Sequence, residues 1–174
     1  MYSEMKKKAK PIVLVDEKDA VLGFKEKFAT HKIPVPLHRA ISIVIYDKKG
    51  RILITKRAAV KPTWGGVWSN AVCTHPYPDE SYKEAAERRL REELGIKTEL
   101  NEVLIFTYRA EMEGGKWGEC ELDHVFKGTY DGRVNPNPEE IDDYKWIEVK
   151  GLKKDLLLYP KKYTPWFKLI LEKI

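Results

Sequence analysis

Short apolar runs bounded by turn residues recur along the first part of the chain. Residues 12–15 and 20–24 predict two short strands around an aspartate-containing turn. Residues 41–46 and 52–55, separated by the turn Asp47-Lys48-Lys49-Gly50, predict a β-hairpin. Several prolines and glycines then predict that residues 58–78 are mostly loop, with a short extended piece near residues 71–73.

The clearest helix is predicted over residues 80–94. Ser81 and Glu84 have the spacing of a capping box, and Gly95 stands where a C-terminal cap belongs. Four apolar residues repeat at helical spacing and form one face of this helix, namely Ala85, Ala86, Leu90 and Leu94. The helix is therefore expected to pack that face against a sheet.

Two charged residues interrupt the apolar face. Arg89 and Glu93 fall in its middle, where a charge is costly unless it is paired or bound to a ligand. One interpretation is a buried ion pair between Arg89 and Glu93, four positions apart. The other is that this face lines an ion site with Glu93 as a ligand. The helix alone leaves both open.

The second half of the chain continues the mixed pattern. Residues 103–110, 117–126 and 144–149 predict strands, the first two separated by a glycine pair. Residues 152–158 and 166–174 predict closing helices. Strands and helices in this order indicate an α/β or α+β fold, with a mixed β-sheet sandwiched between helices.

Length and composition indicate a single globular domain. The chain has 174 residues, 43% hydrophobic and 34% charged, with no repeat or internal linker. We expect one domain over residues 1–174, with residues 1–10 as a loosely ordered basic N-terminus. No apolar run approaches the ~20 residues of a membrane span, and none forms the h-region of a secretory signal. Two cysteines do not make a disulfide framework, so we expect a cytoplasmic protein.

The formal net charge of +5 bears on which kinds of partner the protein can bind. Dense basic clusters occur only at residues 6–10, 153–154 and 161–162. No nucleic-acid-binding module accompanies them, so we interpret these lysines as solvated and expect no nucleic-acid partner. Mild basicity suits a small anionic substrate. We expect no membrane partner. We expect the protein to be a monomer or a weak dimer.

Histidines and carboxylates form a second candidate site. His75 lies two residues after Cys73, and in an extended segment their side chains point the same way. Glu119 and Glu121 repeat this spacing in a predicted strand, although they could equally be a solvated strand face. Together with His31 and His38, these imidazoles and carboxylates could surround one octahedral divalent metal ion. The mixed nitrogen and oxygen donors favour Mn, Mg or Zn over a thiolate site.

These residues, with their neighbours, resemble type 1 isopentenyl-diphosphate isomerase, a branch of the Nudix fold. The resemblance runs from about Val13 to Trp166. It is carried by an ordered series of motifs: His31 and His38; residues 57–61 (Arg-Ala-Ala-Val-Lys); residues 68–76 (Trp-Ser-Asn-Ala-Val-Cys-Thr-His-Pro); Arg88-Arg89-Leu90 with Glu93-Leu94-Gly95; Tyr108-Arg109-Ala110; residues 117–121 (Trp-Gly-Glu-Cys-Glu); and Thr164-Pro165-Trp166.

The resemblance implies a role for each candidate residue. Five would bind the structural-catalytic metal: His31, His38, His75, Glu119 and Glu121. Cys73 and Glu121 would transfer protons, Tyr108 would assist Glu121, and Trp166 would cover the reacting carbon skeleton. A Mg²⁺ ion bridging the substrate diphosphate would be held by Glu93 and the backbone carbonyl of Cys73. The diphosphate would be bound by Lys27, Arg57, Lys61 and Arg89, with Thr74 nearby where many relatives have serine.

The implied reaction, interconversion of isopentenyl and dimethylallyl diphosphate in isoprenoid biosynthesis, explains why these groups are needed. Protonating an unactivated alkene gives a tertiary carbocation that water would capture. The pocket therefore needs an acid and a base on opposite faces, little water, and an aromatic face over the cation. Cys73, Glu121 and Trp166 are residues of these types. Which of Cys73 and Glu121 protonates first stays open.

Other interpretations compete with these roles. Cys73 could be a small buried hydrophobe, and Trp166 could only pack the last helix. Arg57 and Lys61 could be solvated loop charges. We assign purely structural roles to Trp64, Trp146, His124 and Cys120. Because side chains alternate along a strand, the Cys120 side chain should point away from the proposed metal ligands.

A Nudix hydrolase that cleaves a diphosphate-containing substrate is the main alternative function. Seven residues match the Nudix helix signature: Glu80, Arg88, Leu90, Glu92, Glu93, Gly95 and Ile96. Thr74 replaces its glycine, and Arg89 replaces the glutamate after its arginine. Exchanging a metal-binding carboxylate for a cation argues against metal-activated attack of water at phosphorus. A non-catalytic binding protein on the same fold is a third possibility that no residue requires.

Overall fold

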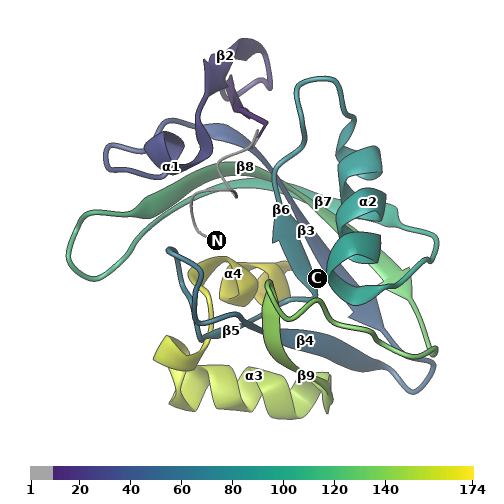
Figure 1. Ribbon diagram of the computed structural model, residues 1–174. Coiled ribbons are helices and arrows are strands. Elements are labelled where there is room, and N and C mark those ends of the chain that lie inside the picture. The colour runs from purple at the N-terminus through teal and green to yellow at the C-terminus, as the bar shows by residue number, and fades with distance from the viewer. Residues whose placement is uncertain (1–9) are drawn as a thin grey trace.

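The computed structural model describes residues 10–174, so the basic cluster at residues 6–8 and most of the predicted loose N-terminus lie outside the described residues. Strand β3 (His38–Tyr46) runs through the centre of the molecule between two layers of helices (Figure 1). Its side chains are buried along nearly its whole length. Such a strand has an almost continuous apolar sequence because both of its faces are covered.

The two faces of β3 pack against different helices. Ile41, Ile43 and Ile45 share a hydrophobic cluster with helix α2 (Tyr82–Leu94). Val44 belongs to a second cluster with α3 (Val149–Leu158) and α4 (Pro165–Lys173). Helices therefore cover the sheet on both sides, which confirms the predicted mixed sheet between helices.

The sheet is mixed in direction. Strand β3 runs parallel to β8 (Gly118–Thr129) and antiparallel to β6 (Val72–Thr74). Strand β8 also pairs with β7 (Asn101–Glu111). The remaining strands are β1 (Ile12–Val15), β2 (Val21–Lys25), β4 (Arg51–Arg57), β5 (Trp68–Ser69) and β9 (Ile141–Glu148).

The predicted hairpin forms only at its turn. Tyr46 pairs with Ile52 across the turn, and the Asp47 side chain accepts hydrogen bonds from the backbone of Lys49 and Arg51. Beyond that pair, β3 takes β8 and β6 as neighbours, whereas β4 takes β9 and β5. The predicted hairpin is therefore confirmed at its turn, and beyond it the two strands separate because each pairs with strands distant in sequence.

Local signals placed α2 well. The Ser81 and Glu84 capping box is present, and Gly95 ends the helix in the left-handed conformation with φ of 64°. The helix begins at Tyr82 rather than at residue 80, since Ser81 is its N-cap. Three short elements were not predicted: strand β5, helix α1 (Lys27–Thr30) and a single 3₁₀ turn (Pro160–Lys162). Elements this short carry no readable periodicity.

Several strands are longer than their apolar pattern indicates. Strand β3 starts at His38 instead of residue 41, and β8 continues to Thr129. The first of the three additional residues at the start of β3, His38, is one of the candidate metal ligands. Among residues 10–174, no helix is both long and apolar enough to cross a membrane.

Candidate active site and metal centre

The register of three neighbouring strands assembles the first part of the site. In the parallel pairing of β3 and β8, His38 lies beside Glu121. In the antiparallel pairing of β7 and β8, Tyr108 lies opposite the same glutamate. Glu121 therefore has a histidine on one side and a tyrosine on the other, although the three residues are far apart in sequence.

The start of β8 also fixes His31. The backbone N–H of Gly118 donates to the His31 carbonyl oxygen at 2.9 Å. A side chain at position 118 would place its Cβ 2.7 Å from the Ala110 carbonyl oxygen, so the close approach of β7 to β8 at this position requires glycine. Gly118 thus holds the segment with His31 against the strand that carries Glu119.

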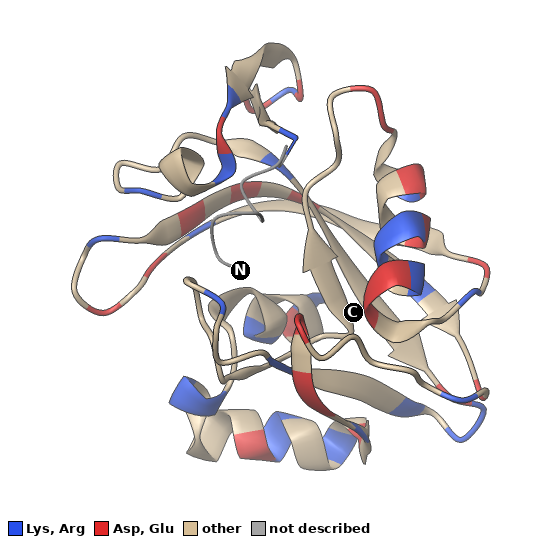
Figure 2. Cartoon of the chain, viewed as in Figure 1, with Lys and Arg blue, Asp and Glu red and all other residues tan. Residues whose placement is uncertain are grey.

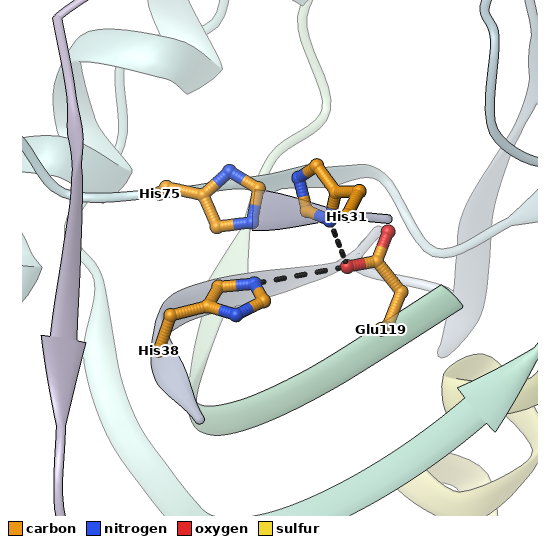
Figure 3. Close-up of side chains that lie close together, drawn as sticks. All are labelled: His31, His38, His75 and Glu119. Carbon is orange, nitrogen blue, oxygen red and sulfur yellow. Dashed lines mark ion pairs between the residues drawn. The ribbon is translucent and has the colours of Figure 1, made fainter. Parts of the chain in front are cut away.

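Three histidines and a glutamate converge on one point (Figure 3). The ring centroids of His31, His38 and His75 are 5.1–5.2 Å apart from one another. One potential ligand atom from each histidine and one from Glu119 all lie within 4.8 Å of one another. We call these four residues with Glu121 the histidine–glutamate cluster.

The donor atoms of this cluster fit a divalent cation. His31 Nδ1, His38 Nε2 and Glu119 Oε2 are buried and have no hydrogen-bond partner among the described residues. His31 Nδ1 and Glu119 Oε2 lie 2.8 Å apart without forming a hydrogen bond, so both face a common point. His38 Nδ1 donates to the Pro36 carbonyl oxygen at 2.8 Å, which directs the Nε2 lone pair into the cluster. Buried imidazole and carboxylate atoms without hydrogen-bond partners are compatible with a divalent metal ion.

The titration of the histidines agrees with this. Burial lowers the pKa of His75 to about 3 and also lowers the pKa of His31, so both imidazoles are neutral near pH 7. Neutral imidazole is the form that binds metal ions. Burial and the neighbouring Glu121 carboxylate raise the pKa of Glu119 well above its usual value. A bound cation would oppose that shift and favour the ionised carboxylate.

Glu121 connects the cluster to Tyr108. One carboxylate oxygen of Glu121 lies 3.1 Å from His75 Nε2 and 3.7 Å from His38 Nε2. The other accepts a hydrogen bond from the Tyr108 hydroxyl at 2.5 Å. Burial alone would raise the pKa of Glu121, but the neighbouring imidazoles of His38 and His75 lower it well below its usual range. The carboxylate is therefore bound on both sides inside the protein.

Cys73 lies in a separate hydrogen-bonded network on β6. Its thiol donates to Asn70 Oδ1 at 3.2 Å, and the Trp166 indole N–H donates to Cys73 Sγ at 3.1 Å. Ser42, its neighbour in β3, approaches Sγ to 3.7 Å and donates to Asp123 at 2.8 Å. Burial raises the pKa of the thiol to about 12, so Cys73 is protonated near neutral pH.

Aromatic rings surround this network. The Trp166 ring lies 5.2 Å from the Trp64 ring and 6.2 Å from the Tyr108 ring, measured between centroids. Trp166 is also buried in the hydrophobic cluster formed with α3 and α4. It therefore packs in the core, as one interpretation predicted, and also contacts Cys73. We assigned only a structural role to Trp64 from the sequence, but its ring lies against the Trp166 ring in this group of aromatic side chains.

Cys73 also lines a pocket that contains basic and acidic residues. It is lined by Arg57, Lys61, Cys73, Glu93 and Glu140, among others, and we call it the charged pocket. Figure 2 shows acidic and basic residues side by side on α2, which borders it. The Arg57 guanidinium donates to the carbonyl oxygens of Trp64 and Thr63, both at 3.0 Å. Arg57 and Lys61 are therefore not simply solvated loop charges.

Of the two interpretations of Arg89 and Glu93, the structure contains the ion pair. Arg89 pairs with Glu93, and it also pairs with Glu92 at 3.0 Å and with Glu140 at 2.9 Å. Glu93 is 4% exposed, and its burial raises the pKa of its carboxyl group. The contact does not exclude an ion site, because Glu93 lines the charged pocket beside Cys73.

The remaining candidates lie at the edge of these groups. Lys27, at the start of α1, lies close enough for the charges of Lys61 and Glu140 to act on its amine. Thr74 follows Cys73 in β6 and is partly buried. Of the predicted diphosphate-binding residues, Arg57 and Lys61 line the charged pocket, and Arg89 pairs with Glu93 and Glu140, which also line it. Lys27 and Thr74 are not among the residues that line this pocket.

Cys120 lies on the other face of β8, as predicted. It borders a different cavity of about 600 Å³, whose lining includes Val15, Leu37 and Arg109. His124 also lies outside the histidine–glutamate cluster, stacked on Tyr82 with 3.5 Å between ring centroids. Both residues therefore serve as internal controls for Cys73 and His75.

Sequence reasoning missed four polar residues of the site. Asn70, Ser42 and Asp123 belong to the Cys73 network, and Glu140 lies in the charged pocket. Asp123 continues the alternation of Glu119 and Glu121 along β8 and could have been found from it. Nothing local marks Glu140, since it follows another glutamate in a loop.

Comparison with known proteins identifies relatives of the chain. The NUDIX domain model matches residues 36–167. "Isopentenyl-diphosphate Delta-isomerase 2" of Aromatoleum aromaticum is 44% identical over 163 residues, covering 94% of this chain and 85% of the relative. "Isopentenyl-diphosphate Delta-isomerase" of Nocardia farcinica is 40% identical and covers 93% of each chain.

Solved structures agree on the fold. DR0079 from Deinococcus radiodurans superposes with a TM-score of 0.78 at 16% identity, covering 94% of this chain and 98% of that one. The MutT protein from Methanosarcina mazei Go1 superposes with a TM-score of 0.63 at 25% identity, covering 79% and 92% of the two chains.

Proposed function

The chain belongs to the isopentenyl-diphosphate Delta-isomerase family of NUDIX-domain proteins, and from this we infer that it is an enzyme that interconverts isopentenyl and dimethylallyl diphosphate in isoprenoid biosynthesis. One observation carries this inference at the site itself. Two proton-transfer candidates, the partly buried Cys73 and the buried Glu121, lie in adjoining networks, and each is held by a hydrogen bond from an aromatic side chain, Trp166 or Tyr108.

We propose that Cys73 and Glu121 exchange protons with the substrate. The neutral Cys73 thiol can give a proton, and the ionised Glu121 carboxylate can accept one. Their roles reverse in the opposite direction of the reaction. The Trp166 ring, with Tyr108 and Trp64 beside it, offers π-faces to the tertiary carbocation and excludes water from it.

The metal sites follow from the donor atoms. We propose that one divalent ion is held by His31, His38, His75, Glu119 and Glu121. When bound, it supplies positive charge that orders Glu121 and lowers the cost of burying the carboxylates. We propose that a Mg²⁺ ion accompanies the substrate diphosphate, with Glu93 and the Cys73 carbonyl oxygen as its protein ligands.

The charged pocket suits the diphosphate. We propose that Lys27, Arg57, Lys61, Thr74 and Arg89 bind its oxygens. Guanidinium and ammonium groups form charge-assisted hydrogen bonds with phosphates. In this interpretation, part of the internal pairing among Lys61, Arg89 and the glutamates is exchanged for pairing with the substrate.

Diphosphate hydrolysis is the second candidate reaction, and Arg89 disfavours it. Arg89 stands where the Nudix helix signature has a glutamate, and its guanidinium already pairs with Glu93 and Glu140. A cation there favours retention of an intact diphosphate over coordination of a metal-activated water.

Product analysis separates the possibilities. The purified protein is incubated with isopentenyl diphosphate and Mg²⁺, and dimethylallyl diphosphate is resolved from free phosphate. We expect the isomer with no net phosphate release. Phosphate as the main product would favour the hydrolase, and neither product would favour a binding protein. The cytoplasmic location, the absence of a nucleic-acid partner and the monomeric or weakly dimeric state stay predictions.

A further inference from the structure

Glu140 joins two cations that come from different parts of the chain. One carboxylate oxygen pairs with Lys61, from the loop after β4, and the other accepts from Arg89 of α2 at 2.9 Å. Burial alone would raise the pKa of Glu140, but the charges of Lys61 and Arg89 lower it to about 2. The carboxylate is therefore ionised near neutral pH.

The backbone around Glu140 is fixed to the same two parts. Its carbonyl oxygen accepts from the Ala58 N–H at 2.9 Å, which ties it to the loop after β4. Three residues earlier, the Asn137 N–H donates to the Glu93 carbonyl oxygen at 2.8 Å, which ties the segment to the end of α2. Glu140 is therefore held at a set distance from both cations.

Arg89 divides its guanidinium between carboxylates with different consequences. The same terminal nitrogen, Nη2, donates to Glu93 and to Glu140. Glu93 is the residue proposed above to bind the Mg²⁺ ion of the substrate. A guanidinium that pairs only with Glu93 would compete directly with that ion, whereas one shared with Glu140 competes less.

We propose that Glu140 is a positioning residue for the magnesium diphosphate: it holds Lys61 and shares Arg89, so that Glu93 stays able to bind the ion. The inference rests on the proposed function, because it takes Glu93 as a ligand of that ion. Without Glu140, the described ion pairs leave Arg89 only with Glu92 and Glu93, both on its own helix. Lys61 then has no ion-pair partner among the described residues.

Binding of inorganic pyrophosphate tests this without turnover. Isothermal titration calorimetry measures its affinity with and without Mg²⁺, after the protein is loaded with the metal of the histidine–glutamate cluster. The ratio of the two affinities is the Mg²⁺ effect. We expect this effect to be about tenfold smaller in Glu140→Gln than in the unchanged protein, the loss of one charge-assisted contact.

Two further variants separate positioning from charge. Glu139→Gln removes the neighbouring, exposed carboxylate and should keep the Mg²⁺ effect within about twofold, because long-range charge is screened. Glu140→Asp keeps the charge but shortens the side chain by one methylene, so it cannot reach both cations. If Glu140 positions them, Glu140→Asp should behave like Glu140→Gln. Thermal unfolding of each variant verifies that it is folded.

Each outcome decides one question. If the unchanged protein binds pyrophosphate without any Mg²⁺ effect, the proposed Mg²⁺ site at Glu93 is wrong, and if it binds no pyrophosphate at all, the proposed diphosphate site is wrong. If the unchanged protein shows a Mg²⁺ effect and Glu140→Gln shows the same effect, only the role of Glu140 is wrong. If Glu140→Asp keeps the full Mg²⁺ effect, the carboxylate acts only through its charge, and the proposed positioning role is wrong.

Discussion

The two regions beside Cys73 solve the problem of buried charge in opposite ways. In the histidine–glutamate cluster, atoms of His31, His38 and Glu119 face one another without hydrogen bonds. In the charged pocket, Lys61 and Arg89 are paired with glutamates of the protein itself. The first region is completed by adding a cation, whereas the second can bind an anion only by exchanging partners.

This difference teaches what each region contributes. A buried polar atom without a partner costs about 1–3 kcal/mol, so convergent unpaired donors are tolerated where a ligand satisfies them. Internal ion pairs carry no such penalty and keep flexible side chains in place before the substrate arrives. The cluster therefore suits a resident metal ion, and the charged pocket suits a substrate that enters and leaves.

The largest expected effect separates chemistry from binding at Cys73. Cys73→Ala should lower turnover at least about 10²–10⁴-fold, the usual contribution of an acid–base group, while pyrophosphate still binds. Cys120→Ala should stay active, because Cys120 faces the other cavity. Steady-state kinetics of both variants measure this. Equal turnover of two well-folded variants would remove Cys73 from the reaction.

The second effect concerns the metal ion proposed for the histidine–glutamate cluster. His75→Ala and Glu119→Gln each remove one donor from the convergent set, and metal affinity should fall at least about 100-fold, beyond the usual effect of residues that only orient ligands. Metal content after dialysis measures the loss. His124→Ala is the matched control, and it should retain the ion because His124 stacks on Tyr82 outside the cluster. Full occupancy in the first two variants would contradict the assignment.

A smaller effect is expected in the charged pocket. Lys61→Ala should raise the KM for isopentenyl diphosphate about tenfold and change kcat little, because it removes one charge-assisted contact to the diphosphate. Lys48→Ala is the control, since Lys48 lies in the exposed turn after β3. A large loss of kcat at unchanged KM would show that Lys61 acts in the chemical step. It would contradict the assignment of the charged pocket to substrate binding alone.

The smallest effects concern stability. Ser42→Ala removes the donor to the buried Asp123 and should lower the free energy of unfolding by about 1–3 kcal/mol. Glu92→Gln removes the half-exposed pairs with Arg88 and Arg89 and should cost less than about 1 kcal/mol. Urea unfolding compares the two. If Glu92→Gln were the more harmful change, the pairs at the edge of the charged pocket would be structural.

Much of the molecule was readable from local patterns. The capping box of Ser81 and Glu84 and the C-cap Gly95 placed α2 within two residues of its position, because they act through hydrogen bonds inside the helix itself. The spacing of Glu119 and Glu121 correctly separated their face from that of Cys120, because strand alternation is also local. The order of motifs indicated the family, and the comparisons confirm it.

What the sequence alone determined about this protein was therefore its main elements, its family and the residue types of its site. The tertiary structure decided which of them meet. The parallel register of β3 and β8 puts His38 beside Glu121, and the splitting of the expected hairpin leaves room for β6, which carries Cys73. Glu140 joins Arg89 only because its loop folds back onto α2. These contacts link residues distant in sequence, and they depend on burial and strand pairing that no local pattern encodes.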